Sequence, residues 1–176
     1  MEEVPEISGG AERLARLPEP LAASAARIAS SLRRAGRQAW IVGGAVRDLL
    51  LDRVPVDVDL VTDALPQEVA ALFDRTITVG ISFGVVIVLD GDVQIEVATF
   101  REERGYSDRR RPDEIRYAAD PAVDARRRDF TCNALFLDPL DGRLLDPTGG
   151  AKDLEIGLLR TVGDPASRFR EDGLRP

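Results

Sequence analysis

Apolar residues recur in short, regular patterns along most of the chain. Leucine, isoleucine and alanine at positions 21, 25, 28, 29 and 32 follow helical spacing, which predicts a helix over about residues 20–36. A short apolar run at residues 40–42 predicts a strand. The two glycines that follow, Gly43 and Gly44, predict a tight turn into a second amphipathic helix.

Strand patterns dominate the middle of the chain. The sequence predicts a strand that carries Asp57 and Asp59, a short helix near residues 68–73, and strands at residues 76–79, 84–89 and 93–99. The last two strands are joined by Asp90-Gly91-Asp92, which is typical of a hairpin turn. In the final strand Val93, Ile95 and Val97 point one way, which leaves Gln94, Glu96 and Ala98 on the other face.

The flanking segments show weaker patterns. Residues 1–10 are expected to be unstructured, and the polar residues 101–114 to form a mobile loop that acts as a lever or lid. A helix is expected over residues 121–137, bent near Arg128 and Asp129, with the buried face Phe130, Ala134, Leu135 and Leu137. The last expected elements are a short helix near residues 151–157, an extended piece at 159–162, and a helix from about residue 165 that is still running at residues 170–172.

The glycine turn and the two aspartates carry the first candidate chemistry. Gly43 and Gly44 let the backbone approach a ligand, and the helix that follows presents unpaired N–H groups, which favours a phosphate. Asp57 and Asp59, at positions i and i+2 of a strand, face the same way and can share Mg²⁺. Either motif alone has a plain structural explanation, as a tight turn or a solvated strand edge. Together they indicate a nucleoside triphosphate site.

Glu96 is a candidate third carboxylate. A mixed sheet that places its strand beside the strand of Asp57 and Asp59 would bring Glu96 to the same metal ions. An exposed glutamate on a hairpin explains the same pattern, so the strand pattern alone leaves both readings open.

Composition narrows the chemistry further. The chain has 176 residues, 44% of them hydrophobic and 31% charged, and no apolar run near membrane-spanning length, so a cytoplasmic globular protein is expected. It contains no histidine and a single cysteine, Cys132, which argues against zinc, disulfides and Ser-His or Cys-His catalysis. We expect Cys132 to be a buried small hydrophobe.

The distribution of charge points to a local anion site. The net charge of −7 argues against a protein that binds nucleic acid by bulk electrostatics. The arginines nevertheless cluster, at Arg101, Arg104, Arg109, Arg110, Arg111 and Arg116, and again at Arg126, Arg127 and Arg128. Such clusters are typical of a phosphate track, although a solvated charge run remains an alternative for the first of them.

Seven segments, in order from about residue 39 to residue 175, carry a specific resemblance: VGGAVRD, DVDL, EVATFR, YSDRRRP, RRRDFTCNALFLDP, LLDPTGGAKDLE and REDGLR. In these segments the chain resembles the catalytic head of class II tRNA nucleotidyltransferases (CCA-adding enzymes) and the related bacterial poly(A) polymerases. The resemblance implies an α+β fold, a polymerase-β-like nucleotidyltransferase head with a mixed sheet packed against helices, leading into the start of a helical neck. It implies an N-terminal extension at residues 1–20, a head domain at 21–160, and a truncated neck at 161–176.

The resemblance also implies a role for each site residue. Two Mg²⁺ ions would be held by Asp57, Asp59 and Glu96, and the triphosphate by Gly43, Gly44 and Arg47. Phosphates and ribose would be contacted by Arg127, Arg128, Asp129 and Asn133. The incoming base would be paired by Glu171, Asp172 and Arg175, with Asp172 accepting from an exocyclic amine and Arg175 donating to the ring.

The implied reaction adds CMP or AMP, from CTP or ATP, to the 3′ end of tRNA, with release of pyrophosphate. Poly(A) addition, CC-only or A-only addition, and a head that binds nucleotide without turnover are the alternatives. The body and tail domains that grip tRNA in the family are absent from this chain, so tRNA binding is expected to be weak. No membrane partner is expected, and the sequence leaves the oligomeric state open.

Overall fold

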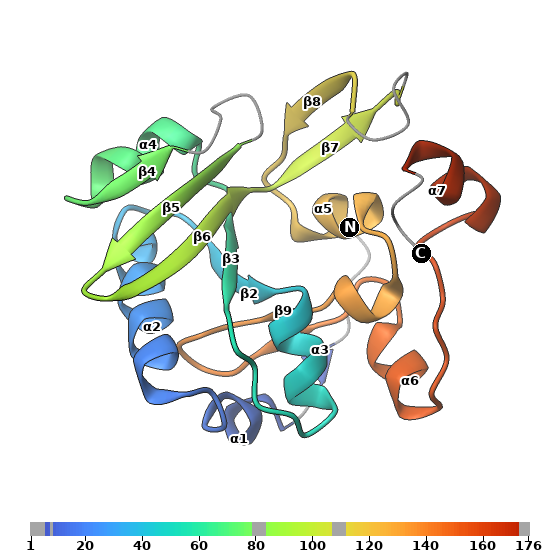
Figure 1. Ribbon diagram of the computed structural model, residues 1–176, viewed down its shortest axis with the longest axis horizontal. Coiled ribbons are helices and arrows are strands. Elements are labelled where there is room, and N and C mark those ends of the chain that lie inside the picture. Colours follow the sequence, from blue (N-terminus) through green and yellow to red (C-terminus); the bar gives the residue numbers. More distant parts are fainter. Residues whose placement is uncertain (1–5, 8, 79–83, 107–111, 173–176) are drawn as a thin grey trace.

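A mixed β-sheet forms the centre of the protein in a computed structural model that describes residues 6–7, 9–78, 84–106 and 112–172 (Figure 1). The strands of this sheet are β1 Glu6–Ile7, β2 Ala39–Val42, β3 Asp59–Thr62, β4 Thr76–Thr78, β5 Val85–Asp90, β6 Val93–Thr99, β9 Phe136–Leu137 and β10 Leu144–Leu145. Their order across the sheet is β1-β10-β9-β2-β3-β6-β5-β4. Strands β3 and β6 pair in parallel, and the other pairs are antiparallel. The predicted mixed sheet is thus confirmed.

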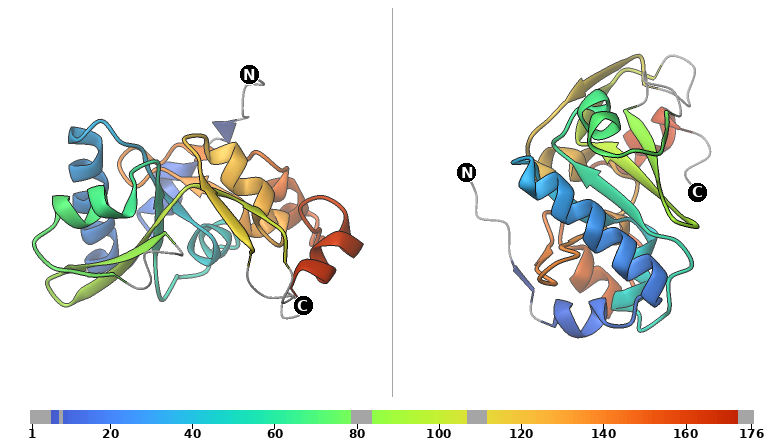
Figure 2. Two further views of the ribbon diagram at one scale, coloured as in Figure 1. Left: turned by 90° about the horizontal axis from the view of Figure 1, so that it is seen from above. Right: turned by 90° about the vertical axis from the view of Figure 1, so that its left-hand side faces the viewer.

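Helices cover both faces of the sheet. They are α1 Gly10–Leu14, α2 Glu19–Arg34, α3 Gly44–Leu50, α4 Pro66–Leu72, α5 Pro121–Arg127, α6 Gly150–Glu155 and α7 Pro165–Glu171, with a 3₁₀ turn, η2, at Thr131–Asn133. Figure 2 shows this arrangement of helices around the sheet from two further sides. Ile41 and Leu60 face a core shared with α2, α3 and α4, whereas Trp40 and Val61 face a second core shared with α5. Successive residues of a strand therefore face opposite sides of the sheet and pack against different helices.

Several expected elements are confirmed. Helix α2 covers most of the predicted range and ends just before Gly36, whose φ is +74°. Strands β5 and β6 form the predicted hairpin, with Asp90 opposite Val93. In β6 Ile95 is buried and Glu96 exposed, as the alternation predicts. Among the described residues, no helix combines the length and the apolar character needed to cross a bilayer.

The expectation of unstructured ends and a mobile loop is wrong in two places. Residues 6–7 form strand β1, and α1 begins at Gly10. Residues 101–114 contain strand β7, Arg101–Arg104, which pairs with β8, Glu114–Tyr117, in a separate two-stranded sheet. Because β7 consists of charged residues only, it has no hydrophobic alternation to reveal it. Arginines 109, 110 and 111 lie outside the described residues.

The single helix expected over residues 121–137 is also wrong. Helix α5 ends at Arg127, and Arg128 has an extended backbone with ψ 160°. Phe130 then forms a bridge with Thr161, and the last two residues of the expected helix form strand β9 beside β2. Pairing with neighbouring segments therefore overrides the helical spacing of the apolar residues. Ala134, Leu135 and Leu137 are buried without forming a helix, and Phe130 is half-buried. Helix α7 likewise stops at Glu171, since the following residue has φ −142° and ψ 115°.

Candidate active site

Two carboxylates meet where β3 and β6 run side by side. Asp59 is paired in register with Glu96. Asp59 lies two positions before Val61, and Glu96 two positions before Ala98, so each carboxylate shares a face of its strand with a residue that packs toward α5. Both carboxylates therefore stand on the sheet face that α5 covers. The predicted approach of Glu96 to the aspartates is confirmed for Asp59.

Asp57 does not lie on the strand that the sequence predicts. Strand β3 begins at Asp59, which is opposite Val42, the last residue of β2. After Val42 the turn at Gly43 leads the chain out of the sheet. Asp57, two positions before Asp59, therefore has no partner on β2. Asp57 is instead exposed in the loop that leads into β3.

The charges of the carboxylates interact. The surrounding protein removes part of the water from the Asp59 carboxyl, and repulsion from Glu96 and Asp57 adds to this effect. Together they raise the pKa of Asp59 to about 6, although the nearby Arg128 opposes the shift. The site therefore concentrates negative charge that a cation would relieve.

The glycine turn faces two guanidinium groups. Gly43 has φ +70° and ψ −136°, a conformation that favours glycine, and Gly44 begins α3. A Cβ atom on Gly43 would lie 3.9 Å from Nη1 of Arg128, and one on Gly44 would lie 3.5 Å from Nη2 of Arg47. Both glycines are half-buried, so the turn remains open on one side.

Arg47, Asn133 and Asp129 form a connected polar group. Arg47 Nη1 donates to Asn133 Oδ1 at 3.1 Å, and Asn133 Nδ2 donates to Asp129 Oδ1 at 3.2 Å. Arg47 also pairs with Asp48 on its own helix at 2.9 Å. The structure thus brings together, across α3 and η2, three residues that the sequence singled out.

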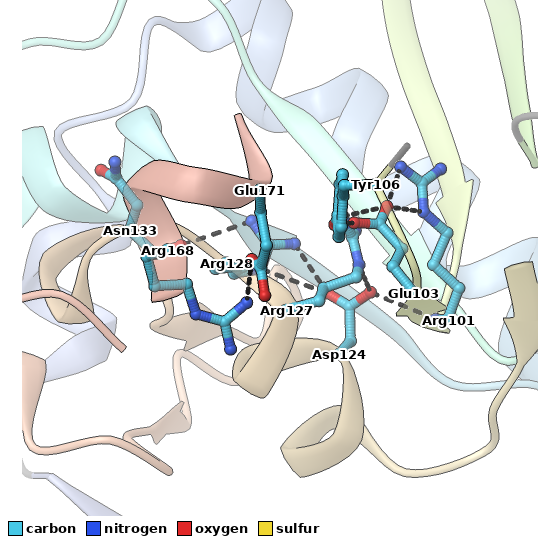
Figure 3. Close-up of polar contacts among 9 residues, drawn as sticks. All are labelled: Arg101, Glu103, Tyr106, Asp124, Arg127, Arg128, Asn133, Arg168 and Glu171. Atoms are coloured by element: carbon cyan, nitrogen blue, oxygen red, sulfur yellow. Dashed lines mark hydrogen bonds and ion pairs between the residues drawn. The ribbon is translucent and has the colours of Figure 1, made fainter. Parts of the chain in front are cut away.

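Arg127 and Arg128 complete the site from α5. They line a pocket of about 180 Å³ together with Asp59, Glu96 and Arg101. Both guanidinium groups are bonded to Asp124, and Arg127 Nη1 also lies 3.3 Å from Glu103 Oε1 on β7 (Figure 3). The pocket therefore combines acidic residues of β3 and β6 with arginines from the end of α5 and from β7.

The predicted base-pairing residues lie on and after α7. Glu171 accepts from Arg168 Nη1 at 2.9 Å, and Arg168 also donates to the carbonyl oxygen of Arg126. These contacts join α7 to the end of α5 that carries Arg127. Asp172 follows the helix, and Arg175 lies outside the described residues.

The donor set fits a divalent cation by its chemistry. In the described part of the chain, no three Asp, Glu, Cys or His side chains are grouped closely enough to hold a metal ion together. Asp59 and Glu96 are neighbours, however, and carboxylate oxygens are the ligands that Mg²⁺ prefers. Asp57 is exposed in the loop before β3, and its charge acts on the Asp59 carboxyl.

Comparison with protein families agrees with this arrangement. The model of the poly A polymerase head domain matches residues 39–160, which include the glycine turn, the carboxylates and the arginines of α5. The chain belongs to the poly A polymerase head-domain family. Nucleotidyltransferases of this polymerase-β-like kind typically use divalent metal ions.

Individual members of the family are similar over most of the chain. A CCA-adding enzyme of Anoxybacillus flavithermus is 47% identical over 148 residues, which are 84% of this chain and 37% of the relative. A CCA-adding enzyme of Streptococcus gordonii is 45% identical over 163 residues, 93% of this chain and 40% of the relative. The chain thus spans about two fifths of the length of these relatives.

Solved structures share the fold. The crystal structure of the Bacillus stearothermophilus CCA-adding enzyme in complex with CTP superimposes with a TM-score of 0.79 and 40% identity, covering 89% of this chain and 37% of that one. An apo structure of a CCA-adding enzyme gives a TM-score of 0.82 at 25% identity, covering 99% of this chain and 42% of that one. The predicted head-domain fold is confirmed.

Two residues of the site were missed from the sequence. Asp124 lies three and four positions before Arg127 and Arg128, a helical spacing that could have indicated an ion pair. Glu103 lies in the segment interpreted as a loop, and no sequence signal places it beside Arg127.

Cys132 is 5% exposed, and burial raises the pKa of its thiol, as expected for a small core residue.

Proposed function

We propose that this chain is the catalytic head of a template-independent RNA nucleotidyltransferase that adds CMP and AMP, from CTP and ATP, to the 3′ end of tRNA. The observation that carries the proposal is the juxtaposition of Asp59 and Glu96 with the Gly43 turn and Arg128. Carboxylates opposite an arginine-lined glycine turn suit a metal-bound triphosphate. The named relatives are CCA-adding enzymes, and the crystal structure at 40% identity contains CTP.

In this proposal the carboxylates hold two Mg²⁺ ions, with Asp57, Asp59 and Glu96 as ligands. The ions, when bound, lower the pKa of the attacking 3′-hydroxyl and neutralise charge on the leaving pyrophosphate. The chain's own part is to place the acidic ligands at one edge of the sheet. The raised pKa of Asp59 supports this role, since partial burial and the charges of Glu96 and Asp57 disfavour its ionised form before any cation binds.

The remaining residues bind the nucleotide. Gly43, Gly44 and Arg47 contact the triphosphate, because the turn admits close approach and the guanidinium stands beside it. Contacts to phosphates and ribose come from Arg127, Arg128, Asp129 and Asn133. Those to the base come from Glu171, Asp172 and Arg175, on a neck that begins near residue 161 and follows a head at residues 21–160.

Two other activities are tested beside this one. The matching family model is that of poly A polymerases, which favours repeated AMP addition as the second candidate. A head that binds nucleotide without turnover is the third.

One experiment separates these activities. The chain is incubated with Mg²⁺, a tRNA transcript that lacks its 3′ CCA, and labelled CTP or ATP, while binding of each triphosphate is measured on the same sample. Incorporation from both triphosphates supports CCA addition, and ATP alone in long tails supports poly(A) addition. Binding without incorporation supports the binding-only head, and failure to bind either triphosphate contradicts the proposal.

A further inference from the structure

Asp124 is a buried carboxylate at the base of the site. Its side chain is 0% exposed, and it lies on α5, one helical turn before Arg127 and Arg128. Oδ1 accepts from Arg127 Nε at 2.8 Å and from the backbone N–H of Arg101 at 3.2 Å. Oδ2 accepts from Arg128 Nε at 3.1 Å and Nη2 at 2.9 Å. Four donors thus use both oxygens of one carboxylate.

The charge of Asp124 is maintained by these partners. Burial alone raises the pKa of a carboxyl group, but the charges of Arg127 and Arg128 outweigh it and lower the pKa of Asp124. In return, Asp124 and Glu103 outweigh the effect of burial on Arg127 and raise its pKa. Burial lowers the pKa of Arg128 in spite of Asp124, but a guanidinium group remains protonated in proteins. The group is therefore an ionised cluster largely shielded from solvent, where each hydrogen bond is strong and directional.

The cluster fixes which edge of Arg128 faces the site. Asp124 occupies the edge formed by Nε and Nη2, so Nη1 is directed elsewhere. Nη1 donates to the carbonyl oxygen of Asn133 at 3.3 Å and is the atom that lies beside Gly43. The ring of Phe136, 5.5 Å from the guanidinium carbon, packs against the same group. Arg128 is thus held between a buried anchor and the glycine turn.

We propose that Asp124 is a positioning residue, which orients the guanidinium groups of Arg127 and Arg128 toward the nucleotide phosphates before the nucleotide arrives. The inference rests on the proposed function. Fixed donors bind an anion more tightly than mobile ones, because less side-chain entropy is lost on binding.

The test is the variant Asp124→Asn, which keeps the size of the side chain. Its amide group turns an acceptor into a donor that faces guanidinium N–H groups, so at least one arginine loses its anchor. We expect the Kd for CTP with Mg²⁺ to rise about ten-fold or more, which corresponds to the loss of one well-placed charged hydrogen bond. Charge alone predicts the opposite, since removing a carboxylate makes the site more positive and tightens anion binding.

Asp138→Asn is the matched control. Asp138 is also 0% exposed and pairs with an arginine, Arg33, but it follows β9 at the end remote from the glycine turn. The Asp138→Asn variant should lose about as much stability as Asp124→Asn, with no change in its Kd for CTP. A Kd for Asp124→Asn that is unchanged, lower, or raised only as much as in Asp138→Asn overturns the proposal.

A second measurement needs no variant. In nitrogen-15 NMR spectra of the nucleotide-free protein, the Nε–H groups of Arg127 and Arg128 should give resolved signals that exchange slowly with solvent. Rapid exchange of both signals means that the arginines are not held in advance, and overturns the proposal even if Asp124→Asn does not fold. The positioning role of Asp124 and the proposed function can be disproved separately. Wild-type protein that binds no triphosphate contradicts the proposed function, whereas the two results above concern Asp124 alone.

Discussion

Replacing Asp59 by asparagine should stabilise the metal-free protein at neutral pH. The folded protein raises the pKa of this carboxyl from 3.8 to about 6, so its ionised form is disfavoured by folding. A shift of this size corresponds to at most about 3 kcal/mol, at about 1.4 kcal/mol for each pKa unit. Because the side chain is exposed, solvent screening reduces the expected gain to about 1 kcal/mol. That gain raises the Tm by about 2–4 °C for a chain of this size.

The sign of the effect depends on pH. Well below pH 3.8 the carboxyl is protonated in both the folded and the unfolded state, and stability from this group is fully present. This stability is lost as pH rises through about 6, where the folded state must give up its proton. The advantage of Asp59→Asn should therefore be seen at pH 7.5 and be largely lost at pH 4.

The assay is thermal unfolding with a metal chelator at both pH values. Asp92→Asn, in the exposed turn between β5 and β6, is the control, since it removes the same charge outside the site. If Asp59→Asn is destabilised at pH 7.5, or gains equally at both pH values, then burial of the Asp59 carboxyl and repulsion from Glu96 and Asp57 do not control the stability of the variant.

Three further predictions concern binding and stability. Mg²⁺-dependent binding of CTP, measured by calorimetry, should weaken as pH falls through about 6, because protonated Asp59 no longer ligates a cation; a flat profile contradicts this. Gly43→Ala should lose about 1–3 kcal/mol in denaturant unfolding, since its backbone conformation favours glycine, and unchanged stability would contradict the strain. Arg47→Lys should weaken CTP several-fold, because lysine lacks the fork that reaches both Asp48 and Asn133; equal affinity would exclude a specific role.

The sequence predicts the turn at the glycine pair and the face of the strand that carries Glu96, but it only partly predicts how distant strands pair. The alternation in β6 places Glu96 on the polar face of its strand, and the glycine pair marks the turn. Nothing in the spacing specifies that β3 and β6 run parallel with Asp59 opposite Glu96, since register depends on tertiary contacts. The resemblance to a known family implied that Glu96 joins the aspartates, but not the direction or the register of the two strands.

Two other elements could not be predicted from hydrophobic periodicity, because ion pairs or pairing with a distant strand determine their structure. Strand β7 has the sequence Arg-Glu-Glu-Arg, with no apolar residue, and Arg101 pairs with Glu103 at 2.6 Å. It therefore resembles a polar loop in the sequence. The residues after α5 keep helical spacing, yet Phe136 forms a strand beside β2. Hydrogen bonding to a neighbouring strand decided that segment, and helical periodicity could not reveal it.

The central claim is that carboxylates of β3 and β6 hold metal ions directly opposite a glycine turn that binds the triphosphate. Crystals grown with CTP and Mn²⁺, with diffraction recorded at the manganese absorption edge, test it most directly. We predict anomalous density beside Asp59 and Glu96, with the triphosphate against Gly43 and Gly44. Ordered CTP elsewhere on the protein, or manganese bound away from both carboxylates, would contradict the claim.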